Sequence, residues 1–399
     1  MTSLVEKFNA LVPDSIFKDL HSLPAVLNKI LRLQEVGARV REGFDDDCFR
    51  KRSSQSILYS CLAKNDLDKV INDLQMKVNP SCVGFDETKA ELRNLRASMN
   101  VDSGAWLQAG VINKRFIMSN DEFAAALCRR NTFECNVVPR LSVALAGDSE
   151  QSLTCRCDRV VKPIDPFGYH MVGCKVGANA IRLHDEVVFT LANLFRSIGI
   201  EPVVEPVRLF DADPDLDDRR RPDILIRNPR GFDRQVTLDV AVTGVDMFGR
   251  VAYDDPYKPL EDRYKQKINK YLRVANQNGL QLIPAVFSHT GQMHGEVKRF
   301  IKDQIRLQLT YTEGEPKSSK VELAFRWWSK CISSVISRTA SRNVLFSSAR
   351  IGKALNVDRV PPLNDDSQDD TKFGSSGDDL QAFIDEFDLM ISNQDVIQF

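Results

Sequence analysis

The chain has 399 residues, of which 43% are hydrophobic and 27% are charged, and this composition is typical of a globular protein with two or three domains. No stretch approaches about 18 uncharged apolar residues, which argues against a membrane span. The first residues include Glu6 and Lys7 and lack the apolar segment of a secretion signal. These features predict an intracellular protein with reduced thiols, so its nine cysteines are not expected to form a disulfide framework.

Charge is unevenly distributed along the chain. Residues 365–399 contain ten acidic residues and one lysine and carry −9; because the whole chain carries −1, the first 364 residues carry +8. A mildly basic body is compatible with nucleic-acid binding without requiring it. The acidic tail, residues 360–399, has few branched apolar residues and is expected to be disordered. Within it, LQAFIDEFDLMI is a candidate binding segment for a protein partner, although a solvated tail without a function is the favoured interpretation.

The N-terminal region, residues 1–135, is predicted to be helical. Apolar residues recur there at intervals of three and four, and Ser119 and Glu122 have the spacing of a helix-capping box. The helix that follows is expected to bury Phe123, Ala126 and Leu127. No pattern in this region indicates chemistry, so we interpret it as a helical bundle or a helical extension.

Residues 136–178 form a loop-rich segment with four potential metal ligands. Cys155, Cys157, His170 and Cys174 follow the spacing Cys-x-Cys-x12-His-x3-Cys. Zinc prefers four tetrahedral Cys and His ligands, and a loop with two prolines and a glycine between the ligand pairs suits a segment that folds around a metal. The segment therefore predicts a zinc knuckle with a structural zinc, the alternative being coincidence among nine cysteines and five histidines.

Residues 179–311 alternate between helical and strand patterns and predict a single layered α/β unit of order α-β-β-β-α-β. The expected elements are a helix, three strands, a helix, a strand and a last helix, at residues 180–199, 202–210, 222–228, 234–243, 259–279, 281–289 and 295–309. Residues 312–359 are predicted to be a C-terminal helical extension, with a helix over 321–349.

Two aspartates occupy strand positions that usually exclude acids. Asp223 opens the strand PDILIR, and Asp239 has apolar neighbours on both sides in VTLDVAVT. Alone, Asp223 could be an ordinary acid at the end of a loop. An unpaired buried carboxylate is costly, however, and natural chains keep one where a partner, most often a cation, compensates it. Because a hairpin would pair the two strands, both acids can converge on one divalent ion.

The two helices that flank these strands offer further groups. Lys267 shares with Tyr271 the helical stripe that is predicted to face the sheet, and His184 lies at the middle of the apolar face of the preceding helix. A lysine on such a stripe usually extends to solvent, and a histidine there is usually an ordinary core residue. Here both can reach the acids. Glu205 is a further possible acid, although an ordinary edge-strand glutamate is the favoured interpretation.

These residues resemble the PD-(D/E)XK restriction-endonuclease-like fold, in which Pro-Asp opens one strand, an acid lies in the next and a lysine is near. The simplest form places the lysine two residues after the second acid, where this chain has Ala241. One branch moves it to the next helix as Lys-x-x-x-Tyr, which Lys267 and Tyr271 match. That branch is the restriction-like endonuclease at the C-terminal end of certain non-long-terminal-repeat retrotransposon proteins.

In that branch a CCHC zinc knuckle and a basic-His-Asn helix motif precede the Pro-Asp. This chain has the knuckle and then Arg182-Leu183-His184-Asp185, so Leu183 interrupts the motif and Asp185 replaces the asparagine. The resemblance covers about residues 100–345. No reverse transcriptase motif is visible, so we expect a detached or truncated element end, or a gene descended from one.

The resemblance implies a metal-dependent DNA endonuclease with a restriction-endonuclease-like α-β-β-β-α-β core, a helical N-terminal region and a small zinc knuckle. Asp223 and Asp239 would bind Mg²⁺, which activates a water and stabilises charge on the phosphate. Lys267 would orient or deprotonate that water. Tyr271 and His184 would position the phosphate or the lysine.

The resemblance also implies a nucleic-acid partner, DNA in the first place and RNA as an alternative, and a nuclear location. The knuckle and four arginines would bind backbone phosphates: Arg182, Arg219, Arg220 and Arg221. For the three consecutive arginines, a solvated loop is an equal alternative. The main alternative function is a catalytically inactive nucleic-acid-binding protein that retains the fold and the knuckle. A third is an interaction protein that acts through its helical N-terminus and acidic tail.

Overall fold

The computed structural model describes residues 72–73, 75–77, 92, 95–98, 100, 102–108, 116–130, 135, 154–155, 157, 162–165, 167–175, 177–206, 209, 222–244, 255–314, 316 and 318–354. The chain divides into two compact units, residues 1–78 with 398–399, and residues 79–397. In the first unit the described residues, 72–73 and 75–77, are helical and exposed. All other described residues belong to the second unit. The acidic tail, Arg219 to Arg221 and most of the predicted N-terminal helices lie outside the described residues.

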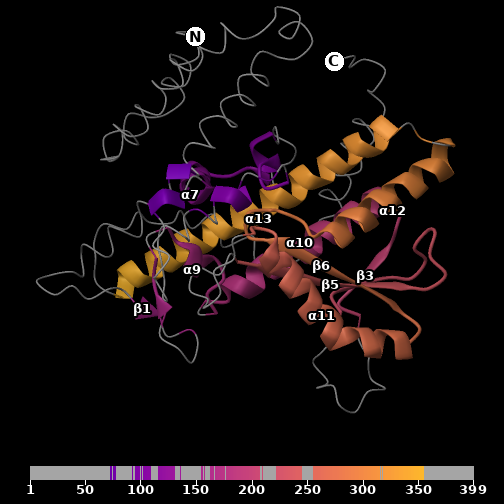
Figure 1. Cartoon of the computed structure of the whole chain (residues 1–399), viewed down its shortest axis with the longest axis horizontal. Helices are drawn as coiled ribbons and strands as arrows, with labels where there is room; N and C mark the ends of the chain where they lie inside the picture. The colour runs from indigo at the N-terminus through magenta and orange to yellow at the C-terminus, as the bar shows by residue number, and fades with distance from the viewer. Residues whose placement is uncertain are drawn as a thin grey trace, which may run out of the picture. The chain divides into compact units, whose positions relative to one another are not determined.

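A four-stranded mixed sheet lies within the second unit (Figure 1). Its strands, in spatial order, are β3 (Pro202–Val204), β4 (Ile224–Ile226), β5 (Val236–Thr243) and β6 (Gln281–Ser288). The first three are antiparallel neighbours, whereas β6 runs parallel to β5. Parallel pairing needs a long crossover, and α11 (Lys258–Gln277) provides it. With α10 (Asn179–Ser197) before β3, the observed order is the predicted α-β-β-β-α-β, and the fold is mixed α/β.

Helices cover both faces of the sheet, which explains why β4 reads as a continuous apolar run. Ile224 and Ile226 belong to the main core, together with residues of α10, α12 (Gly295–Glu313) and α13 (Ser318–Ala354). Leu225 packs in a separate cluster with residues of α11. The sheet therefore lies between α11 and the other helices (Figure 1).

The long helix α13 is buried along most of its length. Its Trp328 is fully buried and meets Phe195 of α10 edge-on, with ring centroids 5.2 Å apart. It also contacts three shorter elements: η1 (Ala105–Gln108), α7 (Asn120–Arg130) and α9 (Tyr169–Val172). Although α13 has 37 residues, neither it nor another described helix has an apolar stretch long enough to cross a membrane.

The start of α7 is as predicted, and Ala126 is buried as expected, but the rest of its buried face differs from the prediction. Ser119 and Glu122 exchange backbone-to-side-chain hydrogen bonds of 2.8 Å and 3.2 Å, as a capping box requires. Phe123, which was predicted to be buried, is exposed, and Glu122 is buried instead. Glu122 forms ion pairs with Arg338 and Arg342 of α13. Because charged groups make this contact, the apolar periodicity of α7 did not reveal it.

Candidate functional site

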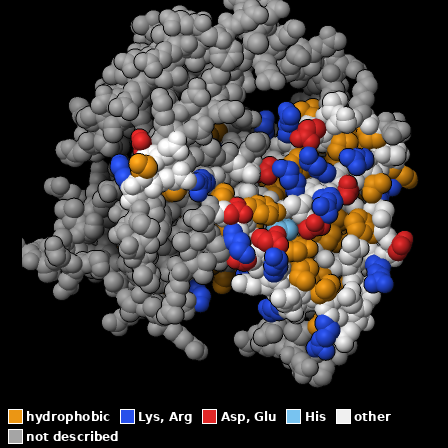
Figure 2. All heavy atoms as spheres, viewed as in Figure 1, with side chains coloured by type: hydrophobic (Ala, Val, Ile, Leu, Met, Phe, Trp, Pro, Cys, Tyr) orange, Lys and Arg blue, Asp and Glu red, His pale blue; other side chains and the backbone are white. Residues whose placement is uncertain are grey.

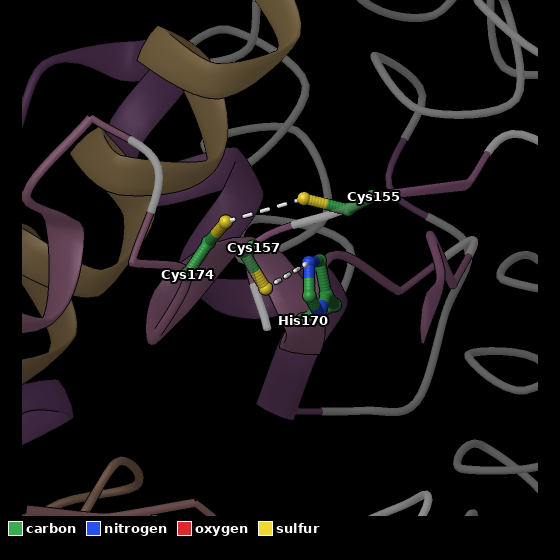
Figure 3. A group of neighbouring side chains, drawn as sticks. All are labelled: Cys155, Cys157, His170 and Cys174. Atoms are coloured by element: carbon green, nitrogen blue, oxygen red, sulfur yellow. Dashed lines mark hydrogen bonds between the residues drawn. The ribbon is translucent and has the colours of Figure 1, made fainter. Parts of the chain in front are cut away.

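The four predicted zinc ligands converge on one point (Figure 3). The Sγ atoms of Cys155 and Cys174 are 3.6 Å apart, and Sγ of Cys157 lies 3.7 Å from Nε2 of His170. All four ligand atoms lie within 4.8 Å of one another. Tetrahedral zinc, with bonds of about 2.3 Å to sulfur and about 2.0 Å to nitrogen, would separate such atoms by about 3.5–3.8 Å. The Cys3His cluster can therefore hold a metal such as zinc.

Two short elements present these ligands. Cys155 ends β1 (Thr154–Cys155), which pairs antiparallel with β2 (Lys162–Pro163), and Cys157 follows two residues later. His170 lies in α9, and Cys174 follows that helix. A hairpin therefore supplies the first ligand pair and a helical turn the second.

Asp165 fixes the turn that carries His170. Its carboxylate accepts the N–H groups of Tyr169 and His170, at 2.9 Å and 2.7 Å, so it caps α9 with a negative charge. Burial raises the pKa of Asp165, and the two hydrogen bonds act in the opposite direction. Gly168 has a φ of 77°, and a Cβ there would lie 2.9 Å from Val344 of α13, so this position needs glycine.

We call the turn that carries the candidate ligands His170 and Cys174 the zinc turn. Two buried asparagines connect it to α10 and α13. Nδ2 of Asn343, on α13, donates to the carbonyls of Val172 and Asn179 at 3.1 Å and 2.8 Å. Nδ2 of Asn179, at the start of α10, donates to the carbonyl of Met171 at 2.6 Å. Because both amides are buried and hydrogen-bonded, they hold α9 firmly against α10 and α13.

A cavity of about 370 Å³ lies next to the zinc turn. Its walls come from α9, α10, β5, α11 and the residue that precedes β4. The polar and ionisable side chains that line it are Tyr169, His184, Asp223, Asp239, Arg263, Lys267, Tyr271 and His289. The structure thus places around one cavity all five residues for which the sequence predicted a catalytic role.

The two aspartates lie side by side on adjacent strands. Ile224 of β4 pairs with Leu238 of β5, so Asp223 and Asp239 occupy the next positions of the two strands. The backbone N–H of Asp223 donates to Leu238, and its Oδ2 accepts the N–H of Val240 at 2.5 Å. The side chain of Asp223 is thereby fixed against the strand that carries Asp239.

Lys267 reaches back from α11 to Asp239. Its Nζ lies 2.7 Å from Oδ2, and the two side chains are only 13% and 5% exposed. Burial raises the pKa of Asp239, and the charge of Lys267 works against that rise. Oδ2 is fully buried and accepts no hydrogen bond of good geometry, so the ion pair is what offsets its buried charge. Tyr271, one turn further along α11, has its ring centroid 5.7 Å from Nζ.

His184 bridges two carboxylates. Nε2 lies 3.2 Å from Oδ1 of Asp223, and Nδ1 lies 2.9 Å from Oδ1 of Asp185. Burial alone would lower the pKa of His184, but its hydrogen bonds and ion pairs with Asp223 and Asp185 raise it to about 9. The ring is therefore protonated at neutral pH and donates from both nitrogens. Asp185, where the resembling family has asparagine, orients this ring.

Arg182 and Glu205 contribute elsewhere. The guanidinium of Arg182 donates to Oδ1 of Asn343 at 2.8 Å and lies over the ring of Phe346, so it contacts α13 and does not line the cavity. Glu205 is exposed, and its backbone N–H donates to the carbonyl of Asp223 at 2.8 Å. Its backbone therefore contacts the site from the residue that follows β3, whereas its side chain does not line the cavity.

The sequence analysis did not identify three of the ionisable residues that line the cavity. Arg263 stands four residues before Lys267, so the helical spacing of α11 could have identified it. Tyr169 and His289 have no comparable signal, because α9 and the end of β6 meet only through tertiary packing. His289 is buried, and its burial, with the charge of Arg129, lowers its pKa to about 3.

No protein-family model matches the chain. Over 134 residues it is 32% identical to the protein named Retrotransposable element SLACS 132 kDa protein of Trypanosoma brucei gambiense. The matched stretch is 31% of this chain and 11% of that protein, so the chain spans about a tenth of this relative. This partial similarity associates the chain with a retrotransposable-element protein.

Proposed function

We propose that the chain is a metal-dependent DNA endonuclease of the restriction-like type, which belongs to a retrotransposable element or descends from one. The observation that carries this proposal is the juxtaposition of Asp223 and Asp239, with Lys267 ion-paired to the second acid. The order of strands and helices and the partial similarity to a retrotransposable-element protein support it.

The acidic pair suits a hard divalent cation such as Mg²⁺. Carboxylates and backbone carbonyls are the ligands that Mg²⁺ prefers, and Asp223, Asp239 and the carbonyl of Val240 are the candidates here. Oδ2 of Asp239 already lies at the ammonium group of Lys267, so a cation at the acidic pair would be placed next to an ion pair that is largely withdrawn from solvent. When bound, the ion would lower the pKa of a water ligand and stabilise negative charge on the scissile phosphate.

The remaining cavity residues orient the reacting groups. Lys267 holds the attacking water or the phosphate through an ammonium group that already lies at the acidic pair. Tyr271 is buried beside Lys267 and limits the conformations of its side chain. His184, held between Asp185 and Asp223, keeps the latter carboxylate in place.

The Cys3His cluster has a structural part in this proposal. Four protein ligands leave no open position for chemistry on zinc. The cluster instead fixes α9, whose Tyr169 and Val172 form one wall of the cavity. Cleavage of chromosomal DNA by this enzyme would take place in the nucleus.

The second candidate function is nucleic-acid binding without cleavage. One observation favours it: both carboxylate oxygens of Asp223 already have protein partners, the ring of His184 and the N–H of Val240. A cation would have to share these oxygens or displace a partner. A protein in which these contacts persist would keep its fold and its zinc site but would not hydrolyse DNA.

Nicking of supercoiled plasmid in the presence of Mg²⁺ separates the two candidates. We expect nicking by the wild type that EDTA abolishes, loss of nicking in Asp223→Asn, and full activity in Asp233→Asn, which changes an exposed acid in the turn between β4 and β5. All three proteins should retain plasmid in a gel-shift assay. Retention by all three without nicking by any would support the binding protein and reject the nuclease.

A further inference from the structure

We infer that one flank of α11 binds the phosphodiester backbone of a DNA strand and leads that strand into the acidic cavity. The inference rests on the proposed function, but it concerns binding, which is measurable without cleavage. We call the three cations that form this surface, Arg263, Lys270 and Arg273, the basic flank.

The charge of α11 is one-sided along its sequence. From Arg263 to Gln277 the helix contains five cations and no acid. Its acids, Glu261 and Asp262, lie in the first turns, where they pair with Lys265 and Lys258. An ordinary solvated helix face alternates acids and bases in such i,i+4 pairs. The acids of α11 are thus confined to its first turns, and the basic flank extends beyond them.

The basic flank is exposed and contiguous. At 100° per residue, Arg263, Lys270 and Arg273 fall within an arc of about 80° on α11. All three are exposed, whereas Lys267, about 40° outside this arc, is largely buried and points to Asp239. The flank therefore meets the cavity at Arg263 and extends away from it through Lys270 and Arg273.

The basic flank also joins the cavity directly. Arg263 lines the cavity, and its NH1 donates to Gln266 at 3.1 Å, which keeps the guanidinium on this side of α11. Nζ of Lys270 lies 4.5 Å from the ring centroid of Tyr271, a residue that lines the cavity. On the face that Figure 2 shows, lysines and arginines stand around acidic side chains and a histidine. A polyanion on this flank would thus lie within reach of the acidic pair.

The length of the basic flank fits a nucleic-acid strand. Arg263 and Arg273 are ten residues apart, so they are separated by about 15 Å along the helix axis. Consecutive phosphates of one B-form strand advance by about 3.4 Å along the duplex, so a flank parallel to the duplex axis would extend over about four of them. Contacts to phosphates carry no sequence information, so we expect this surface to bind without base preference.

Fluorescence anisotropy with a labelled DNA duplex, over a series of salt concentrations, tests the inference. The test variant is Arg263→Gln/Lys270→Gln/Arg273→Gln. The control is Lys265→Gln/Arg306→Gln/Arg326→Gln, which removes the same charge at side chains that are 62%, 59% and 71% exposed. We expect the test variant to bind about tenfold or more weakly at low salt. Its slope of log K against log salt should fall by about 2 to 3, and the control should keep nearly the wild-type slope.

Equal affinities and equal slopes in the two triple variants would overturn the inference. So would a competition experiment in which poly-glutamate, at the same concentration of charge, displaces the DNA from the wild type. A parallel assay of plasmid nicking by the wild type distinguishes the proposed nuclease activity from the proposed DNA binding by the basic flank. Selective loss of binding in the test variant, with no nicking by wild type, would support the basic flank and reject the nuclease. Nicking by wild type, with no difference between the triple variants, would support the nuclease and reject the basic flank.

Discussion

The ammonium group of Lys267 on α11 lies 2.7 Å from a carboxylate oxygen of Asp239 in the middle of β5. Both side chains are largely withdrawn from solvent, so neither can exchange its partner for water without a cost in free energy. This ion pair ties the crossover helix to the sheet at the point where the two candidate metal-binding acids meet.

Removal of Lys267 should therefore destabilise the fold through Asp239. We expect Lys267→Met to lower the free energy of unfolding by about 3 kcal/mol, because it leaves a buried carboxylate without its cation. Asp239→Asn in the same chain should recover most of that loss. Urea unfolding of the two single variants and the double variant gives the coupling energy directly.

The matched control for this cycle is Lys265→Met. Lys265 lies on the same helix and pairs with Glu261, but it is 62% exposed, so its removal should change the free energy of unfolding by less than about 0.5 kcal/mol. Equal losses in Lys265→Met and Lys267→Met would mean that the buried pair contributes no more than an exposed one.

The Cys3His cluster predicts about one bound zinc per chain. Cys157→Ser should lower the zinc content well below that and lower the melting temperature, because the zinc turn is held partly by its metal. Cys128→Ser, on α7 and outside the cluster, should keep its zinc. Elemental analysis of the purified proteins decides: metal-free wild type, or full zinc content in Cys157→Ser, would reject the site.

Stability at acid pH should depend on His289. Burial, followed by the charge of Arg129, lowers the pKa of His289 from 6.5 to about 3 in the folded chain. As the pH falls below about 6.5, the unfolded chain takes up this proton first, so stability is lost between about pH 6.5 and pH 3.

His289→Gln should remove the contribution of His289 to the pH dependence of the free energy of unfolding. Between about pH 6 and pH 4.5, we expect the free energy of unfolding of the wild type to fall more steeply than that of the variant, by up to about 1.4 kcal/mol per pH unit. Urea unfolding at several pH values measures both curves. Parallel curves over this range would show that His289 titrates in the folded chain as it does in the unfolded one.

Asn343 should matter to the zinc turn although it binds no metal. Asn343→Leu leaves the buried carbonyl of Val172 without its donor, and we expect a loss of about 2 kcal/mol or more in the free energy of unfolding. Zinc should also dissociate faster, which a chromogenic chelator reports. Asn276→Leu, at an exposed position of α11, is the control. A zinc release rate in Asn343→Leu equal to that of the control would show that Asn343 does not stabilise the zinc turn.

Much of the α/β core could be predicted because its signals are local. Short segments of sequence predict β4 and α11. The signals are the apolar run after Asp223 and the amphipathic stripe through Lys267 and Tyr271. The expected hairpin also predicted that Asp223 and Asp239 lie close together, and the strand register places them at adjacent positions of β4 and β5.

What could not be predicted depends on contacts between distant parts of the chain. Glu122 is buried because α13 supplies two arginines to it, and no property of α7 alone reveals that. Tyr169 lines the cavity because Asn343 and Asn179 hold the zinc turn against α10. Periodicity placed His184 on the inward face, but its orientation by Asp185 became clear only from the structure.

Cleavage by Asp239→Asn tests the central claim most directly. The measurement is the single-turnover rate of hydrolysis of a labelled DNA duplex, at saturating protein and with Mg²⁺, and anisotropy in parallel confirms that the duplex is bound. The account predicts Mg²⁺-dependent cleavage by wild type and a rate at least about a hundredfold lower in Asp239→Asn, with DNA affinity little changed. Equal rates in the two proteins, or wild-type cleavage that persists in EDTA, would contradict it.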